Sequence, residues 1–184
     1  VAPPDMIDET VEEIREMQTH SSSVVAVKAA RALGELLDRE FAAVEEYERA
    51  LERNAAALRR ANPSHASLHN AMRDVVDAVD EADSADVAAA KEATADAIEA
   101  VTERIEAGKR RAAERAADRL ADGETLFTHD YSSTVLEALD VAVADGKHFE
   151  VYVSEARPRY LGRKTARTLA EYDPVDVHLV VDSA

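Results

Sequence analysis

The hydrophobic periodicity of this chain changes near residue 123, and this change constrains its fold more than any other feature. Before that point, apolar residues recur three and four positions apart, the spacing of one face of an α-helix. After it, short Val-rich apolar runs alternate with amphipathic segments, the pattern of right-handed βαβ units. We therefore predict an α/β protein. Residues 1–122 form a helical domain, and residues 123–184 form the first βαβαβ part of a Rossmann-like parallel sheet.

Local signals subdivide both regions. Ser23 and Ser64 are predicted to cap helices, a further helix is predicted over residues 41–58, and Pro63 stops it because the residue before proline disfavours the helical region. A long Ala-rich helix is predicted over residues 86–120. Strands are expected over residues 125–128, 149–153 and 177–181, with helices over 132–145 and 162–172. Since no helix follows the last strand, the sheet looks truncated.

The charge balance limits the partners of the chain. It has 38 acidic and 22 basic residues, a net charge of −16 and no cysteine. Nucleic-acid binding is disfavoured because phosphate contacts need clustered cations, and thiolate chemistry is excluded. Without a signal-like N-terminus or an apolar run of about 20 residues, we expect a cytoplasmic protein that does not span a membrane. The acidic residues are spread along the whole chain, which favours a protein adapted to high salt. An ordinary acidic protein is the alternative.

Salt is therefore expected to stabilise the fold. At low ionic strength the carboxylates of a chain with a net charge of −16 repel one another, and molar salt shortens the range of that repulsion to about 3 Å. The melting temperature should rise between dilute buffer and molar KCl. An unchanged or falling melting temperature would contradict the salt-adaptation hypothesis.

Polar residues follow each predicted strand, at the sheet edge where open parallel sheets bind ligands. Ser132, Ser133 and Thr134 precede or open a helix, where N–H groups attract anions, although plain N-capping explains them as well. Arg157 and Lys164 belong to a cationic run after the second strand. They suit an anion, and the alternative for this run is pairing with local acids such as Glu155. We expect Arg157 to face the anion and Arg159 and Arg163 to point outward.

The helical region holds fewer candidates. His20 and Ser21 lie in a polar break between two predicted helices. His65 and His69 stand on one helix face at a spacing that fits a metal, but no third ligand is apparent in the sequence. We therefore predict neither a metal nor a cofactor.

Three segments together resemble a known family. They are Thr128-His129 with Ser132 to Leu136, Glu155 to Arg163, and Val180 to Ala184. Their order and spacing are similar to those of the initiation factor 2B alpha, beta and delta subunits and their archaeal homologues. This family includes ribose-1,5-bisphosphate isomerase and methylthioribose-1-phosphate isomerase. The resemblance implies a Rossmann-like domain and oligomerisation through it, with a copy of the same chain or a related subunit.

Departures from the family pattern bear on catalysis. The isomerases have a catalytic cysteine where this chain has Asp130, a phosphate-binding Arg-Gly-Ala-Gly turn where it has His20 to Ser23, and an arginine where it has Asn62. We therefore expect a non-catalytic regulatory protein that binds a phosphorylated metabolite or a partner subunit. The alternatives are a divergent ribose-1,5-bisphosphate isomerase that uses Asp130, and a fragment of a longer protein. The predicted ligand-binding residues are Ser132, Ser133, Thr134, Arg157, Lys164, His20 and Ser21.

Overall fold

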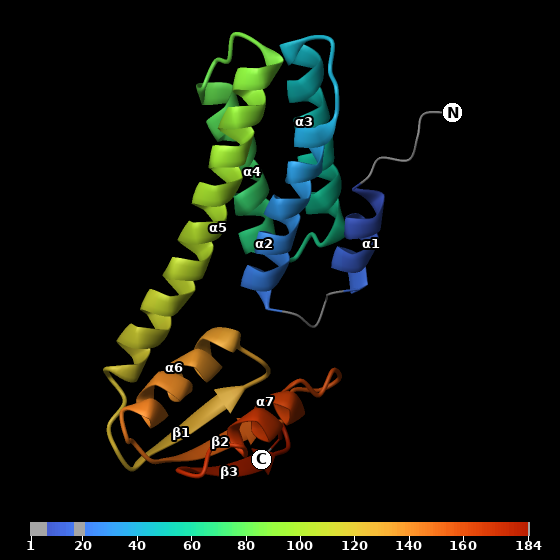
Figure 1. Ribbon diagram of the computed structural model, residues 1–184. Coiled ribbons are helices and arrows are strands. Elements are labelled where there is room, and N and C mark those ends of the chain that lie inside the picture. Colours follow the sequence, from blue (N-terminus) through green and yellow to red (C-terminus); the bar gives the residue numbers. More distant parts are fainter. Residues whose placement is uncertain (1–6, 17–20, 184) are drawn as a thin grey trace. The chain divides into compact units, whose positions relative to one another are not determined.

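The computed structural model describes residues 7–16 and 21–183 and contains two compact units (Figure 1). The units divide between Glu106 and Ala107. This division lies within the long helix α5 (Val87–Ala117), earlier in the chain than the boundary that the change of periodicity predicts after residue 122. The helix continues across the division because its sequence keeps helical spacing on both sides, while the residues that it packs against change.

The N-terminal unit is helical, as predicted. It comprises α1 (Asp8–Glu16), α2 (Ser22–Ala32), the 3₁₀ helix η2 (Leu33–Asp38), α3 (Val44–Ala61), α4 (Ala66–Glu81) and the first part of α5. Figure 1 shows α2, α3 and α4 side by side and alternating in direction. Helix α2 packs mainly against α4, and α3 packs against α4 as well. Among the described residues, no helix is long and apolar enough to cross a membrane.

A buried tyrosine shows how the helical core accommodates polar atoms. Tyr47 is fully buried, and its hydroxyl donates a hydrogen bond of 2.7 Å to Oγ1 of Thr94 on α5. Thr94 in turn donates to the carbonyl of Ala90 at 2.8 Å. Burial comes first among the causes that raise the pKa of Tyr47, and the chain of hydrogen bonds satisfies the hydroxyl without water.

Helix starts in this unit differ from those predicted. Ser21, rather than Ser23, caps α2 and accepts a hydrogen bond from the N–H of Val24. His65, rather than Ser64, stands at the N-cap of α4, because the Ser64 hydroxyl donates to Oδ1 of Asn62 instead. Helix α3 begins at Val44, and Phe41 lies before it with its ring edge-on to Tyr47. The predicted stop before Pro63 is confirmed, since α3 ends at Ala61.

The C-terminal unit holds the predicted parallel sheet. It comprises β1 (Glu124–His129), α6 (Ser133–Ala144), β2 (Phe149–Ser154), α7 (Gly162–Leu169) and β3 (Val175–Val180). The strand order is β1-β2-β3, and both pairs are parallel. The register places His129 beside Ser154 and Ser154 beside Val180. The three strands therefore end at one edge of the sheet.

The two faces of this sheet differ in burial. Phe149, Val151 and Val153 lie on the covered face and pack with apolar residues of α6 and α7 in one core. Both helices lie there because right-handed crossovers in one winding direction place successive helices on the same side. The opposite face, termed the open face, carries Phe127, Tyr152 and His178. Phe127 on this face is 68% exposed.

Candidate functional site

The candidate site lies at the edge where the three strands end. His129 is the last residue of β1, Ser154 is the last of β2, and Asp182 follows β3. Nδ1 of His129 and Oγ of Ser154 are 2.5 Å apart, and Ser154 is buried. Hydrogen bonds from the backbone N–H groups of Arg157 and Ala156 lower the pKa of Asp182, and the nearby His129 makes a smaller contribution in the same direction. The topology thus brings together side chains from three separate segments.

Asp130 occupies an unusual position directly after β1. Its backbone is left-handed, with a φ of 64°, a conformation that aspartate tolerates better than most residues. Its carbonyl accepts a hydrogen bond of 2.7 Å from Oγ1 of Thr165, a buried residue of α7. The side-chain atom Oδ1 is buried without a hydrogen-bond partner among the described residues. A buried acceptor without a partner costs free energy, so Oδ1 of Asp130 has an unused capacity to accept a hydrogen bond.

The start of α6 lies directly after Asp130. Ser132 is the N-cap, and its hydroxyl accepts a hydrogen bond of 3.3 Å from the N–H of Val135. The N-capping explanation is therefore confirmed for Ser132. Ser133 and Thr134 begin the helix and are half-buried. An anion role for these three residues stays a prediction, supported by the positive end of a helix dipole at this edge.

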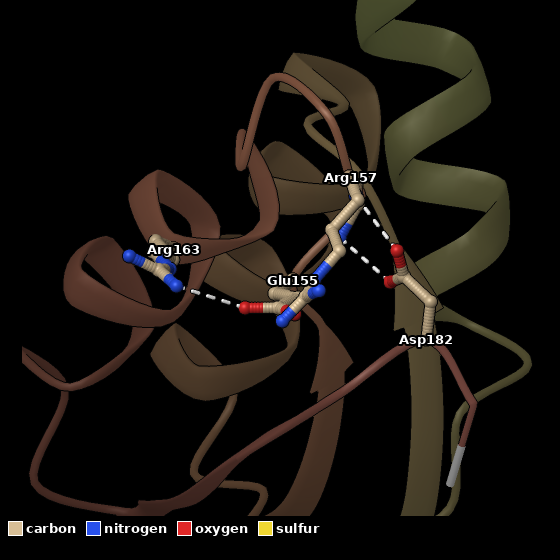
Figure 2. Close-up of polar contacts among 5 residues, drawn as sticks. Glu155, Arg157, Arg163 and Asp182 are labelled. Carbon is tan, nitrogen blue, oxygen red and sulfur yellow. Dashed lines mark hydrogen bonds and ion pairs between the residues drawn. The ribbon is translucent and has the colours of Figure 1, made fainter.

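The cationic run after β2 is arranged around Glu155, as Figure 2 shows. The Glu155 side chain is only 5% exposed. Nε of Arg157 lies 2.5 Å from one of its carboxylate oxygens. A terminal nitrogen of Arg163 lies 2.9 Å from the other oxygen. Hydrogen bonds from Arg163 and then Arg157 lower the pKa of Glu155. The alternative of pairing with a local acid is thus the one observed. The prediction that Arg163 points outward is wrong, because the start of α7 turns it back toward Glu155.

Tyr160 and Asp182 complete this arrangement. The Tyr160 ring centroid lies 4.2 Å from the Arg163 guanidinium and 5.7 Å from that of Arg157, within the range of cation–π contact. The Asp182 carboxylate accepts hydrogen bonds from the backbone N–H groups of Ala156 at 2.8 Å and Arg157 at 2.7 Å. These bonds, that from Arg157 foremost, lower the pKa of Asp182. Arg157 is therefore restrained at both its backbone and its side chain.

Lys164, the second predicted cation, contacts the loop after β1. Its ammonium is 4.2 Å from the centroid of the Tyr131 ring, and Tyr131 stands between Asp130 and the Ser132 cap. The structure therefore places Lys164 against the residue that directly precedes Ser132. Arg157, in contrast, is directed at Glu155, which the sequence favours only as an alternative partner.

The remaining candidate residues lie in the N-terminal unit, at the start of α2 and around the start of α4. Figure 1 shows the start of α2 and the α3–α4 connection at the same end of the helices. The hydroxyl oxygens of Ser21, at the start of α2, and Ser23 lie 3.1 Å apart. The predicted His20 lies outside the described residues. Asn62 is only 4% exposed, and its Nδ2 is buried without a hydrogen-bond partner among the described residues, as are Nδ1 of His65 and Nε2 of His69. Within the described chain, no three metal-ligating side chains gather around a common point.

Several residues of this edge are not predicted as site residues from the sequence. Asp182 lies in a segment too short to stand out. Ser154, Tyr160 and Gly162 lie in the segment that follows the second strand but are not among the predicted ligand-binding residues, and Thr165 lies outside that segment. The positions of Ser154 and Asp182 nevertheless carry a usable signal, since these residues immediately end or follow strands of a parallel sheet. The contacts of Thr165 and Tyr160 depend on how α7 packs, which no local pattern reveals.

Comparison with known proteins identifies the class to which this fold and site belong. Residues 18–184 match the model of the Initiation factor 2 subunit family, and the chain belongs to that family. The ribose 1,5-bisphosphate isomerase of Haloferax volcanii is 34% identical over 176 residues, which are 95% of this chain and 53% of the relative.

Other similar proteins carry translation-factor names. A putative translation initiation factor eIF-2B subunit 2-like protein of Pyrococcus furiosus is 29% identical over 187 residues, with 98% of this chain and 60% of the relative covered. The crystal structure of the Pyrococcus horikoshii translation initiation factor eIF-2B superposes with a TM-score of 0.82 at 27% identity, over 98% of this chain and 61% of that one. The chain thus spans little more than half the length of these relatives.

Proposed function

We propose that this protein binds a ribose phosphate at the carboxyl edge of its sheet and acts as a divergent sugar-phosphate isomerase, with Asp130 as a proton-transfer group. The observation that carries this proposal is the buried, unpartnered Oδ1 of Asp130 beside the start of α6. The similarity to proteins named ribose 1,5-bisphosphate isomerase, at 34% and 35% identity, supports the choice of substrate class. It favours the enzymatic alternative over the non-catalytic protein expected from the sequence alone.

The ligand would be held by its phosphate and positioned by its hydroxyl groups. The N–H groups that open α6 and the Lys164 ammonium provide a positive region for a phosphate. Asp130 then lies within the same loop and can accept a hydrogen bond from a sugar hydroxyl. An aldose–ketose isomerisation needs a group that takes up a proton from carbon and delivers it elsewhere. A carboxylate without a competing internal partner can serve that purpose.

Replacing Asp130 by asparagine tests this role. The amide keeps the shape of the side chain but cannot accept a proton, so turnover of ribose 1,5-bisphosphate should fall by at least about 100-fold, the usual contribution of acid–base catalysis. Phosphorus NMR follows both turnover and binding. Asp118→Asn changes an exposed aspartate at the end of α5 and should leave turnover unchanged. Turnover that survives Asp130→Asn would refute the catalytic role.

A non-catalytic binding protein is the second candidate, favoured by a specific observation. This chain has Asp130 at the position where the isomerases that it resembles have a cysteine. In addition, Arg157 and Arg163 are already paired with Glu155. In that case the wild-type protein should bind ribose phosphates without converting them. If it binds neither ribose 1,5-bisphosphate nor simpler ribose phosphates, both candidates are wrong.

A further inference from the structure

His129, the last residue of β1, places an imidazole at the carboxyl edge of the sheet, directly before Asp130. His129 is exposed, whereas Ser154, to which it is bonded, is only 3% exposed. Nδ1 of the ring lies 2.5 Å from Oγ of Ser154. This bond to a buried hydroxyl uses one ring nitrogen, so the other nitrogen, Nε2, is available for contact with a ligand at the sheet edge.

A hydroxyl is a suitable partner for a ring that gains and loses protons. When the His129 ring is neutral, the Ser154 hydroxyl can donate a hydrogen bond to Nδ1. When the ring is protonated, Nδ1–H can donate to the same oxygen. The bond therefore persists in both states and holds the ring in place while Nε2 exchanges its proton. Imidazole is also the side chain that ordinarily exchanges protons near neutral pH.

The other histidines of the described C-terminal unit differ in partner and in position. His148 lies just before β2, at the amino edge of the sheet, and its Nδ1 is 3.3 Å from Oδ1 of Asp122. His178 lies within β3, and its Nε2 is 3.2 Å from Oε1 of Glu150. An ionised carboxylate only accepts hydrogen bonds, so it can bond only to a ring nitrogen that carries a proton. Among these histidines, His129 alone combines a hydroxyl partner with a place at the carboxyl edge, where open parallel sheets bind ligands.

The proposed isomerisation of ribose 1,5-bisphosphate moves two hydrogens, one between carbons and one between oxygens. Opening the ring breaks the bond between C1 and the ring oxygen O4; its electron pair stays on O4, which gains a proton. The hydrogen on C2 is removed as a proton, and its electron pair forms a double bond between C1 and C2. C1 then takes up a proton while O2 loses its own and forms the carbonyl at C2. The atoms and electrons balance without an oxidant or a reductant, but the two transfers occur at different atoms of the sugar.

We propose that His129 carries the proton between the sugar oxygens and that Ser154 is the residue that positions its ring. Nε2 of the protonated ring donates to O4 as the sugar opens, and the neutral ring then accepts the proton of O2. The starting state of the ring is thereby restored. The Asp182 carboxylate supplies compensating negative charge near the ring. This proposal rests on the proposed function, in which Asp130 transfers the carbon-bound proton.

The test is chemical rescue of a variant without the imidazole. His129→Ala should lower the turnover of ribose 1,5-bisphosphate by at least about 100-fold, and free imidazole should restore it by about tenfold or more, because it can enter the exposed site and transfer the proton. Asp130→Asn should not respond to imidazole. Ser154→Ala should lower kcat with little change in KM, because a loosened ring impairs the reaction rather than binding. His148→Ala is the control and should keep turnover within about twofold of wild type.

Two results would overturn this proposal alone. One is near-normal turnover by His129→Ala while Asp130→Asn is inactive, and the other is a loss in folded His129→Ala that imidazole does not relieve. If His129→Ala does not fold, His129→Asn takes its place, because its amide can still bond to Ser154 but cannot transfer a proton; full turnover by that variant would also overturn the proposal. A wild-type protein that binds ribose 1,5-bisphosphate without converting it would instead refute the isomerase function, and this proposal with it.

Discussion

Replacing Gly162 by alanine should destabilise the C-terminal unit by about 3 kcal/mol or more, the upper range for adding a methyl group to a packed region. A Cβ at this position would lie 1.8 Å from the carbonyl oxygen of Ser154 and 2.8 Å from its carbonyl carbon. These are backbone atoms of β2, so no side-chain rotation can relieve the overlap. The start of α7 would have to move away from the strand, together with the residues that hold Glu155.

Gly108→Ala is the matched control for this substitution. Gly108 also lies in a helix, but a Cβ there would meet nothing within 4 Å, so the change should stabilise α5 by up to about 1 kcal/mol. Denaturant unfolding followed by near-ultraviolet circular dichroism reports on the C-terminal unit, which holds four of the five tyrosines. A Gly162→Ala variant as stable as the wild type would show that α7 does not pack against the carbonyl of Ser154.

Replacing Glu155 by glutamine should lower the melting temperature of the C-terminal unit by about 5 °C at neutral pH, the size of shift expected when a domain this small loses one interaction. The substitution removes the negative charge that lies between the guanidinium groups of Arg157 and Arg163. Two cations are then left beside a neutral amide, and they repel each other. The backbone contacts of Asp182 remain, so the loop is weakened rather than unfolded.

The effect of Glu155→Gln should depend on pH. Hydrogen bonds from the two arginines lower the pKa of Glu155 in the folded state. Its contribution is therefore fully present above the ordinary carboxyl range, near pH 4, and is lost as the pH falls through the lowered pKa. The difference between wild type and variant should narrow in that acid range. Glu114→Gln, at an exposed site on α5, is the control. A difference that stays constant from pH 7 into the acid range would contradict the charge-based explanation.

The contacts around Glu155 change how the cationic run after β2 is understood in functional terms. The sequence predicts that Arg157 holds an anion, but its side chain and backbone are both engaged, by Glu155 and Asp182. These contacts give the loop after β2 a defined shape beside Asp130 and the start of α6. We therefore regard Lys164 and the α6 N-terminus as the better candidates for phosphate contact. Arg157 and Arg163 then stabilise the loop through their contacts with Glu155.

The class of fold and the order of its elements follow from local patterns in the amino-acid sequence. Helical spacing before residue 123 and alternating apolar runs after it are local properties, because each reflects which side of one helix or strand is buried. The stop of α3 before Pro63 and the cap at Ser132 are equally local. The strand-end edge is also predictable, since parallel strands joined by right-handed crossovers must end together. Sequence patterns therefore point to the strand-end segments that hold Ser132, Arg157 and Lys164, whereas Asp130 is singled out only by the family resemblance.

Which partner each charged or polar group contacts at that edge depends instead on packing between elements. Whether Arg157 faces a ligand or Glu155 depends on where the start of α7 lies, and this position depends on the absence of a side chain at Gly162 against the carbonyl of Ser154. The backbone of Asp130 is likewise held from α7, through the hydrogen bond that Thr165 donates to its carbonyl. Such contacts join residues that are distant in sequence, so their geometry is set by tertiary packing, which no periodicity within a single element records.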